Sequence, residues 1–188
     1  MHNDYQLTKN ELREQKLSKE EYIKQKKNGI IVILDNPKNL YNVGQIIRTL
    51  EAFRIYRLII SGKDESILKS KKVKLSSIGL EKWLEIDFCS NSDLPYIIEN
   101  LKNRSCKVYA VELTKYALSY QDISLNKPPV VLIFGNEATG LNDSTIQQCD
   151  ESIYIPISGM ANSLNLSISV GIVVSSLLKE FKNSTKEL

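Results

Sequence analysis

The stretch that decides the fold is VVLIFGNEATGL, residues 130–141. Its first five residues, Val130–Phe134, form an uninterrupted apolar run rich in β-branched side chains, and a glycine follows at once. An apolar run of this length without polar alternation is typical of a strand buried on both faces of a parallel sheet. We therefore expect a central strand at 130–134, followed by a tight loop over Gly135–Leu141 that lets a ligand approach the backbone.

Short apolar runs of the same kind recur on both sides of this strand. They lie at Ile30–Leu34, Leu58–Ile60, Lys107–Val111 and Ser152–Ile155. Segments of helical periodicity separate most of them, at Gln45–Phe53, Asp93–Lys102 and Ser144–Cys149. Strands that alternate with helices predict an α/β fold, with a parallel sheet covered by helices on both faces.

The last predicted helix runs from about Ser163 to Phe181 and is apolar almost all the way round, so we expect it to be buried. Ser167, Gly171 and Ser175 recur every four residues and share one helical face. Small side chains on one stripe allow another backbone to approach closely. Two interpretations stay open, namely tight packing within the subunit and an interface between subunits.

Size and composition limit the class of protein. The chain has 188 residues, of which 42% are apolar and 25% charged, as is usual for one or two folded domains. Leu164–Leu178 is too short to span a membrane, and the polar N-terminus does not resemble a signal peptide. We therefore expect a cytoplasmic protein without membrane association.

Few residues are available for histidine- or cysteine-based chemistry. The single histidine is His2, and the three cysteines are far apart in the sequence. This pattern argues against a disulfide framework, a zinc site and a Ser-His-Asp or Cys-His catalytic centre. The net charge of +3 is too small to establish a nucleic-acid partner by itself.

Residues 1–28 differ from the rest of the chain and are expected to form an N-terminal helical arm before a domain at 29–188. They carry seven basic and five acidic side chains, with capping boxes at Thr8–Glu11 and Ser18–Glu21. Two short helices that end near Lys27 are predicted, with Gly29 as the stop. The arm is either a solvated leader packed against the body or an element that touches RNA.

Three loops follow predicted strands, at the edge of a parallel sheet where ligands bind. The first, DNPKNLYNVGQIIR at 35–48, contains Asn42 as a candidate helix cap, Gly44 near the helix start and Arg48 about one turn further on. A plain cap and a surface cation would explain these residues equally well. The second loop, Gly135–Leu141, lacks the lysine of a Walker A loop and the GxGxxG spacing of dinucleotide-binding folds. Taken alone, it is better explained as a connection from a strand to a helix.

The third loop, IPISGMANSLNLSIS at 155–169, contains Pro156 as a strand end and Gly159 as a bend. Ser163 is placed to cap the last helix, and Asn165 is expected in its first turn. A polar side chain in that apolar neighbourhood needs a hydrogen-bond partner. A self-capping helix start is the simpler interpretation.

In combination, order and spacing these loops resemble the three signature motifs of the SpoU/TrmH-type RNA ribose 2′-O-methyltransferases of the SPOUT superfamily. The motifs are NVGQIIRT (42–49), FGNEATGL (134–141) and the 155–169 loop, and the resemblance covers roughly residues 30–180. The stretch KVKLSSIGLEKWLEI (72–86) also resembles the family's linker. Ala138 departs from the family, which usually has glycine at that position.

The resemblance implies a C-terminal deep trefoil knot, a homodimer and S-adenosyl-L-methionine as cofactor, and it requires no metal. Local sequence patterns do not predict a knot. The implied cofactor-binding residues are Leu113, Gly135, Asn136, Ile155, Ile157, Gly159 and Leu164.

The resemblance also implies catalytic roles for Arg48, Asn42, Glu137, Ser163 and Asn165. Arg48 corresponds to the family's proposed catalytic residue, although a guanidinium with a pKa above about 12 is a poor base. It is either deprotonated with the help of a phosphate or remains charged and stabilises the developing alkoxide. The densest basic run is a candidate RNA patch, or else a solvated face: Lys69, Lys71, Lys72 and Lys74.

The leading hypothesis is methylation of a ribose 2′-hydroxyl in structured RNA, in tRNA rather than rRNA. The alternative is a catalytically silent RNA-binding module that retains the knotted fold. A doubly wound nucleotide-binding domain or hydrolase is a third class, which the two missing nucleotide motifs disfavour.

Overall fold

The computed structural model describes residues 5–123 and 129–184, with side chains up to Lys179. In this part of the chain, seven parallel strands form one sheet in the order β3-β2-β1-β6-β4-β7-β5. The strands are β1 Ile30–Asp35, β2 Arg57–Ser61, β3 Ile86–Cys89, β4 Lys107–Val111, β5 Leu118–Ser119, β6 Val130–Phe134 and β7 Glu151–Tyr154. The predicted parallel α/β sheet is confirmed.

Strand β6 occupies the centre of the sheet, as its composition predicts. It pairs with β1 on one side, where Ile30 is opposite Val130, and with β4 on the other, where Lys107 is opposite Val130. All five residues of β6 are buried. The strands β3 and β5 are not predicted from sequence, because β3 is only half-buried and β5 has two residues at the sheet edge.

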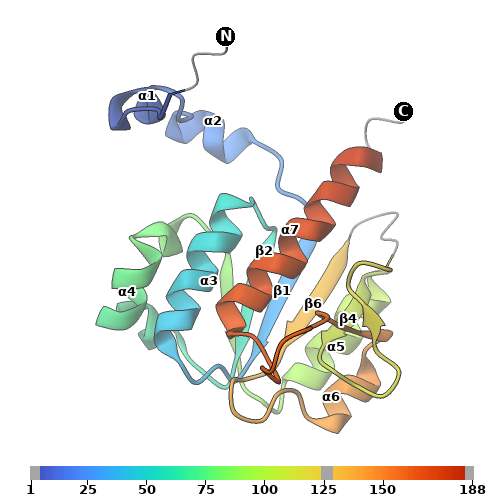
Figure 1. Ribbon diagram of the computed structural model, residues 1–188. Helices are drawn as coiled ribbons and strands as arrows, with labels where there is room; N and C mark the ends of the chain where they lie inside the picture. The colour runs from blue at the N-terminus through green and yellow to red at the C-terminus, as the bar shows by residue number, and fades with distance from the viewer. Residues whose placement is uncertain (1–4, 124–128, 185–188) are drawn as a thin grey trace.

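Helices cover both faces of the sheet (Figure 1). On one face lie α3 (Leu40–Ala52), α4 (Lys71–Ser77) and α7 (Leu166–Ser184); on the other lie α5 (Leu94–Asn103) and α6 (Asp143–Gln148). The sheet side chains alternate between two cores accordingly, so Leu34 packs in the α3/α7 core and Ile33 in the α5 core. Two short 3₁₀ segments, Glu65–Lys69 and Leu80–Lys82, complete the α3 side.

Helix α3 begins earlier than its sequence suggests. Asn39 is the N-cap, because its side chain accepts the backbone N–H of Tyr41 at 3.0 Å. The prediction that Asn42 caps the helix is therefore wrong, and Arg48 lies two turns into it. Gly44 lies inside the helix, where a Cβ would come within 2.0 Å of the Ser76 hydroxyl and 2.6 Å of a backbone oxygen of α4. Glycine at this position thus brings α4 against α3.

Helix α7 begins at Leu166, so the prediction that Ser163 caps it is wrong. The Asn165 side chain, which precedes the helix instead of lying in its first turn, accepts the backbone N–H of Ser167 at 2.8 Å. The helix is also less buried than expected, since Ile168 is 54% exposed.

The small-residue stripe of α7 partly faces α3. The Ser167 hydroxyl lies 3.0 Å from Oε1 of Gln45, and a Cβ on Gly171 would come within 3.9 Å of the Thr49 methyl group. Ser175, in contrast, is exposed. Packing within the subunit thus explains Ser167. Gly171 leaves room for a methyl group against Thr49 and Ser175 is exposed, so this packing requires a small side chain at neither position.

The N-terminal segment forms α1 (Lys9–Glu14) and α2 (Lys19–Lys24), and both predicted capping boxes are present. The second helix ends at Lys24 instead of near Lys27. Its Tyr22 anchors it to the body: the hydroxyl donates to Glu51 at 2.7 Å, Arg54 lies 4.0 Å from the ring centre, and Trp83 meets the ring edge-on. None of the helices formed by the described residues is both long and apolar enough to cross a membrane.

Candidate active site

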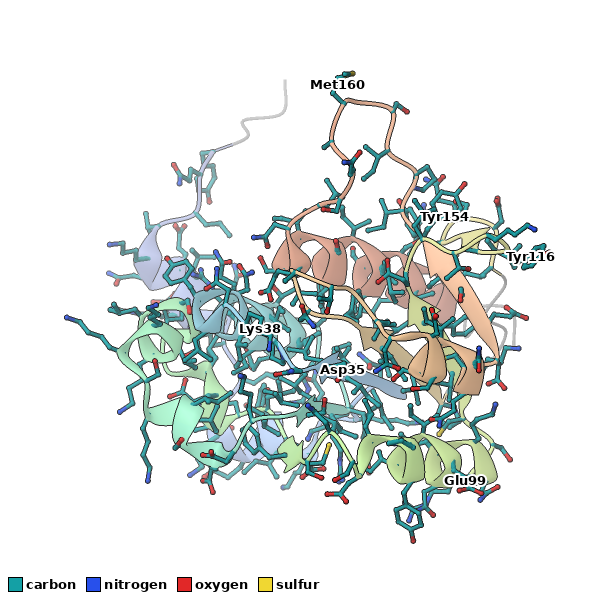
Figure 2. The ribbon with its side chains drawn as sticks, turned by 90° about the horizontal axis from the view of Figure 1, so that it is seen from below. Asp35, Lys38, Glu99, Tyr116, Tyr154 and Met160 are labelled. Carbon is teal, nitrogen blue, oxygen red and sulfur yellow. The ribbon has the colours of Figure 1, made fainter. Side chains whose placement is uncertain are left out.

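A cavity of about 1530 Å³ opens at the carboxyl edge of the sheet, which Figure 2 shows from below. Its walls come mainly from five segments distant in the sequence, 38–42, 111–113, 134–140, 154–157 and 161–166, to which Lys72 and Ser169 are added. The three loops that sequence analysis singles out therefore meet around one space. Beyond this space the 155–165 loop projects outward, with the fully exposed Met160 at its tip (Figure 2).

A chain of polar contacts joins the three loops on one side of the cavity. The Asn42 amide donates to Oε1 of Glu137 at 2.8 Å, and the Asn165 amide donates to the side-chain oxygen Oδ1 of Asn42 at 3.1 Å. Asn165 accepts in turn from the backbone N–H and the hydroxyl of Ser167. Residues 42, 137 and 165 thus form one connected group, and Asn42 has a contact role in place of the predicted cap.

The Glu137 carboxylate is held in its charged form. Burial alone would raise its pKa, but donors outweigh burial and lower the pKa below the usual value. The backbone N–H groups of Lys38 and Asn39 donate at 2.9 and 3.3 Å, and the Asn42 amide adds a third hydrogen bond. Glu137 is therefore an anionic anchor for the start of α3 and not a proton donor at neutral pH.

The variant Glu137→Gln should be less stable than the natural chain at neutral pH, because its uncharged amide is a weaker acceptor and presents an N–H group to other donors. A lowered carboxyl pKa contributes stability that is present above the unfolded value of 4.5 and is lost as the pH falls through the folded value. Urea unfolding between pH 3 and 7 should thus show the difference shrinking below about pH 4.5. A difference independent of pH would contradict this.

The loop 135–141 is closed by its own side chains and backbone. Asn136 accepts the N–H groups of Ala138 and Thr139 at 2.9 and 3.0 Å and donates to the Thr139 hydroxyl. A Cβ on Gly135 would lie 2.1 Å from the backbone carbon of Gly140. Glycine at 135 is therefore required by the loop itself, a steric reason different from the expected approach of a ligand.

Sequence analysis missed Glu112, which lines the cavity directly after β4. Its carboxylate accepts the backbone N–H of Leu141 at 3.0 Å and that of Leu113 at 3.1 Å. The contact joins the end of β4 to the glycine loop. An acidic residue immediately after a predicted buried strand was the available signal for it.

Apolar side chains also line the cavity. Leu113 is 67% exposed, and Ile157 and Leu164 are each 37% exposed. Exposed apolar side chains that converge on a concave surface are typical of a site that binds a partly apolar ligand. Ile155, which also lines the cavity, is partly buried against the core.

Several expected site residues do not line this cavity. Arg48 lies in an adjacent depression of about 280 Å³ together with Tyr41, Gln45 and Ser167. Gly159 has open space around it in the projecting loop. Of the four lysines in the basic run only Lys72 reaches the cavity, whereas the others are absent from its lining: Lys69, Lys71 and Lys74.

Comparison with solved structures identifies the class of fold. The crystal structure of the Aquifex aeolicus TrmH/SpoU tRNA modifying enzyme superimposes with a TM-score of 0.76 at 29% identity, over 88% of this chain and 81% of that one. An AdoMet-bound rRNA methyltransferase from Sinorhizobium meliloti gives a TM-score of 0.71 at 27% identity, over 82% of this chain and 57% of that one. These matches place the protein among the SpoU/TrmH enzymes, which are knotted SPOUT folds.

Sequence comparison gives the family. The model of the SpoU rRNA Methylase family matches residues 29–175. A tRNA (guanosine(18)-2′-O)-methyltransferase of Aquifex aeolicus is 31% identical, over 82% of this chain and 71% of the relative. A 23S rRNA (guanosine-2′-O-)-methyltransferase of Acinetobacter baylyi is 32% identical, over 78% of this chain and 58% of the relative. The chain belongs to the SpoU rRNA methylase family and is therefore an RNA ribose 2′-O-methyltransferase.

Proposed function

We propose that this enzyme methylates a ribose 2′-hydroxyl in structured RNA, in tRNA rather than rRNA. The observation that carries the site assignment is the contact chain from Glu137 through Asn42 to Asn165, which joins all three motifs beside one cavity. The Aquifex aeolicus relative, of which this chain covers 71%, is a tRNA enzyme, whereas the chain covers 58% of the Acinetobacter rRNA enzyme. A larger share of the tRNA enzyme than of the rRNA enzyme is thus matched by this chain, which favours tRNA as the substrate.

The cavity suits S-adenosyl-L-methionine, the cofactor implied by the motifs. The exposed side chains of Leu113, Ile157 and Leu164 offer an apolar wall for an adenine ring, and Gly135, Asn136 and Ile155 supply backbone groups beside it. When bound, this cofactor supplies a methyl group activated by attachment to a sulfonium. Gly159 lies in the projecting loop outside the cavity lining, so it takes no part in the cofactor site proposed here.

The protein must align a weakly nucleophilic hydroxyl and stabilise the charge that develops on its oxygen. We assign the second task to Arg48 in its charged form, since its guanidinium is a poor base but a strong ligand for phosphate and alkoxide oxygens. Ser163 and Asn165 line the cavity and are available to orient the ribose. Asn42 and Glu137 hold the loops that carry them.

A homodimer accounts for the position of Arg48. In one subunit Arg48 and the cavity occupy separate depressions, and exposed apolar side chains surround both, among them Tyr41, Leu75, Ile157 and Ile168. A second copy packed over these side chains would cover them and bring one subunit's Arg48 to the other's cavity. Sedimentation of the purified chain at micromolar concentration should show a dimer; a monomer would contradict this part of the proposal.

The substrate is tested by mixing the purified chain with methyl-labelled S-adenosylmethionine and, separately, with tRNA and rRNA from cells that lack the protein. Label should enter tRNA and should protect the adjacent phosphodiester bond from alkaline cleavage, as a 2′-O-methyl group does. Label in rRNA alone would overturn the choice of tRNA. Cofactor binding without transfer to either RNA would instead support a catalytically silent RNA-binding module.

A further inference from the structure

Four charged side chains line the cavity, two acidic and two basic. The acidic and the basic side chains differ in whether they have hydrogen-bond partners. The carboxylates of Glu112 and Glu137 are each occupied by backbone N–H groups. The ammonium groups of Lys38 and Lys72, in contrast, form no hydrogen bond or ion pair with any described residue. Two unpaired positive charges therefore remain for a ligand.

The backbone of both lysines is held firmly. The N–H of Lys38 donates to Glu137 at 2.9 Å, so this residue is attached to the contact chain that joins the motifs. Lys72 lies in the first turn of α4, where its N–H donates to the Ser70 cap, and the close approach at Gly44 keeps that helix against α3. Figure 2 labels Lys38 on the edge of the sheet where the cavity opens. The side chain of each lysine thus starts from a fixed point of the cavity wall.

We propose that Lys38 and Lys72 form a phosphate subsite, which holds the RNA backbone next to the target ribose. This inference rests on the proposed function, and it adds Lys38, which sequence analysis did not select. A lysine ammonium binds phosphate as a point charge and needs no base-specific geometry. The subsite would therefore fix the position of the strand without reading its sequence.

An anionic oxygen in the cavity has two possible sources, an RNA phosphate and the carboxylate of the cofactor. The cofactor carries a sulfonium and an ammonium against one carboxylate, so it is a net cation that two further positive charges would repel. RNA carries a negative charge at every phosphate, and neutralising phosphates is a main source of its affinity for proteins. The charge balance favours the phosphate.

The test compares Lys38→Gln, Lys72→Gln and the double variant with Lys82→Gln, which removes one charge from an exposed residue outside the cavity lining. Binding to tRNA is measured by fluorescence anisotropy at several salt concentrations, and binding of S-adenosylmethionine by calorimetry. Each cavity variant should weaken RNA binding several-fold and lower the slope of log affinity against log salt by about 1. The affinity of each variant for S-adenosylmethionine should stay within about twofold of that of the natural chain.

Three results separate the possibilities. If the natural chain methylates RNA but the cavity variants match Lys82→Gln in affinity and salt slope, the subsite is overturned. Loss of cofactor affinity in Lys38→Gln or Lys72→Gln would overturn it too, because it assigns the lysines to the cofactor carboxylate. If the natural chain methylates neither tRNA nor rRNA, the proposed function fails instead.

The charge-conserving variants Lys38→Arg and Lys72→Arg serve as a control. They should keep most of the RNA affinity that the glutamine variants lose, because the subsite depends on positive charge.

Discussion

Replacing Arg48 with alanine should lower methyl transfer by about 10²–10³-fold, the usual loss when one preorganised donor for developing negative charge is removed. The guanidinium is exposed and makes no hydrogen bond or ion pair with the described residues, so its removal should leave folding intact. Affinity for S-adenosylmethionine should be nearly unchanged. Single-turnover methylation, calorimetric cofactor binding and thermal unfolding measure the three quantities.

Arg48→Lys distinguishes the two roles of this residue. A charge-stabilising role predicts partial activity with the same pH profile, because lysine stays protonated up to a pKa of about 10.4. A role as proton acceptor predicts a profile displaced to lower pH, since an ammonium loses its proton more readily than a guanidinium. Turnover of Arg48→Ala equal to that of the natural chain would remove this residue from the mechanism.

Gly135→Val should weaken cofactor binding. The new Cβ would lie 2.1 Å from the backbone carbon of Gly140 and 2.4 Å from the backbone nitrogen of Leu141, and neither atom belongs to a side chain that can rotate away. Overpacking of this kind costs about 1–3 kcal/mol. If the loop carries the whole cost, calorimetry should show S-adenosylmethionine binding roughly 5- to 150-fold more weakly.

Two further glycine variants calibrate this result. Gly135→Ala adds the same Cβ without branching and should show a smaller loss of the same kind. Gly171→Ala adds a methyl group that meets Thr49 at an ordinary 3.9 Å, so it should keep or raise the melting temperature. Unchanged cofactor affinity in Gly135→Val would refute the placement of the cofactor beside this loop.

The sheet was predictable because its central strands carry a strong local signal. Val130–Phe134 and Lys107–Val111 have the bounds that their apolar runs predict. The edge strands β3 and β5 have no such signal, since one is half-buried and the other has only two residues. Their pairing depends on neighbours that no local pattern reveals.

The site was predictable as a set of loops but not in its contacts. Asn42 was predicted to cap a helix, yet Asn39 caps α3 and Asn42 turns inward to Glu137, 95 positions away in the chain. Such a partner is chosen by the tertiary fold, because local hydrogen-bonding potential is the same at Asn39 and Asn42. The separation of Arg48 from the main cavity has a similar origin, since it depends on which face of α3 meets the sheet.

The place of β6 in the sheet also affects how the chain is made. Because β6 lies between β1 and β4, those two strands cannot pair with each other, and their inner edges stay open until residues 130–134 have left the ribosome. The nascent chain thus exposes apolar strand edges while most of its length already exists, which favours aggregation. Chaperone demand during translation should accordingly be high, and a fragment ending before β6 should be insoluble.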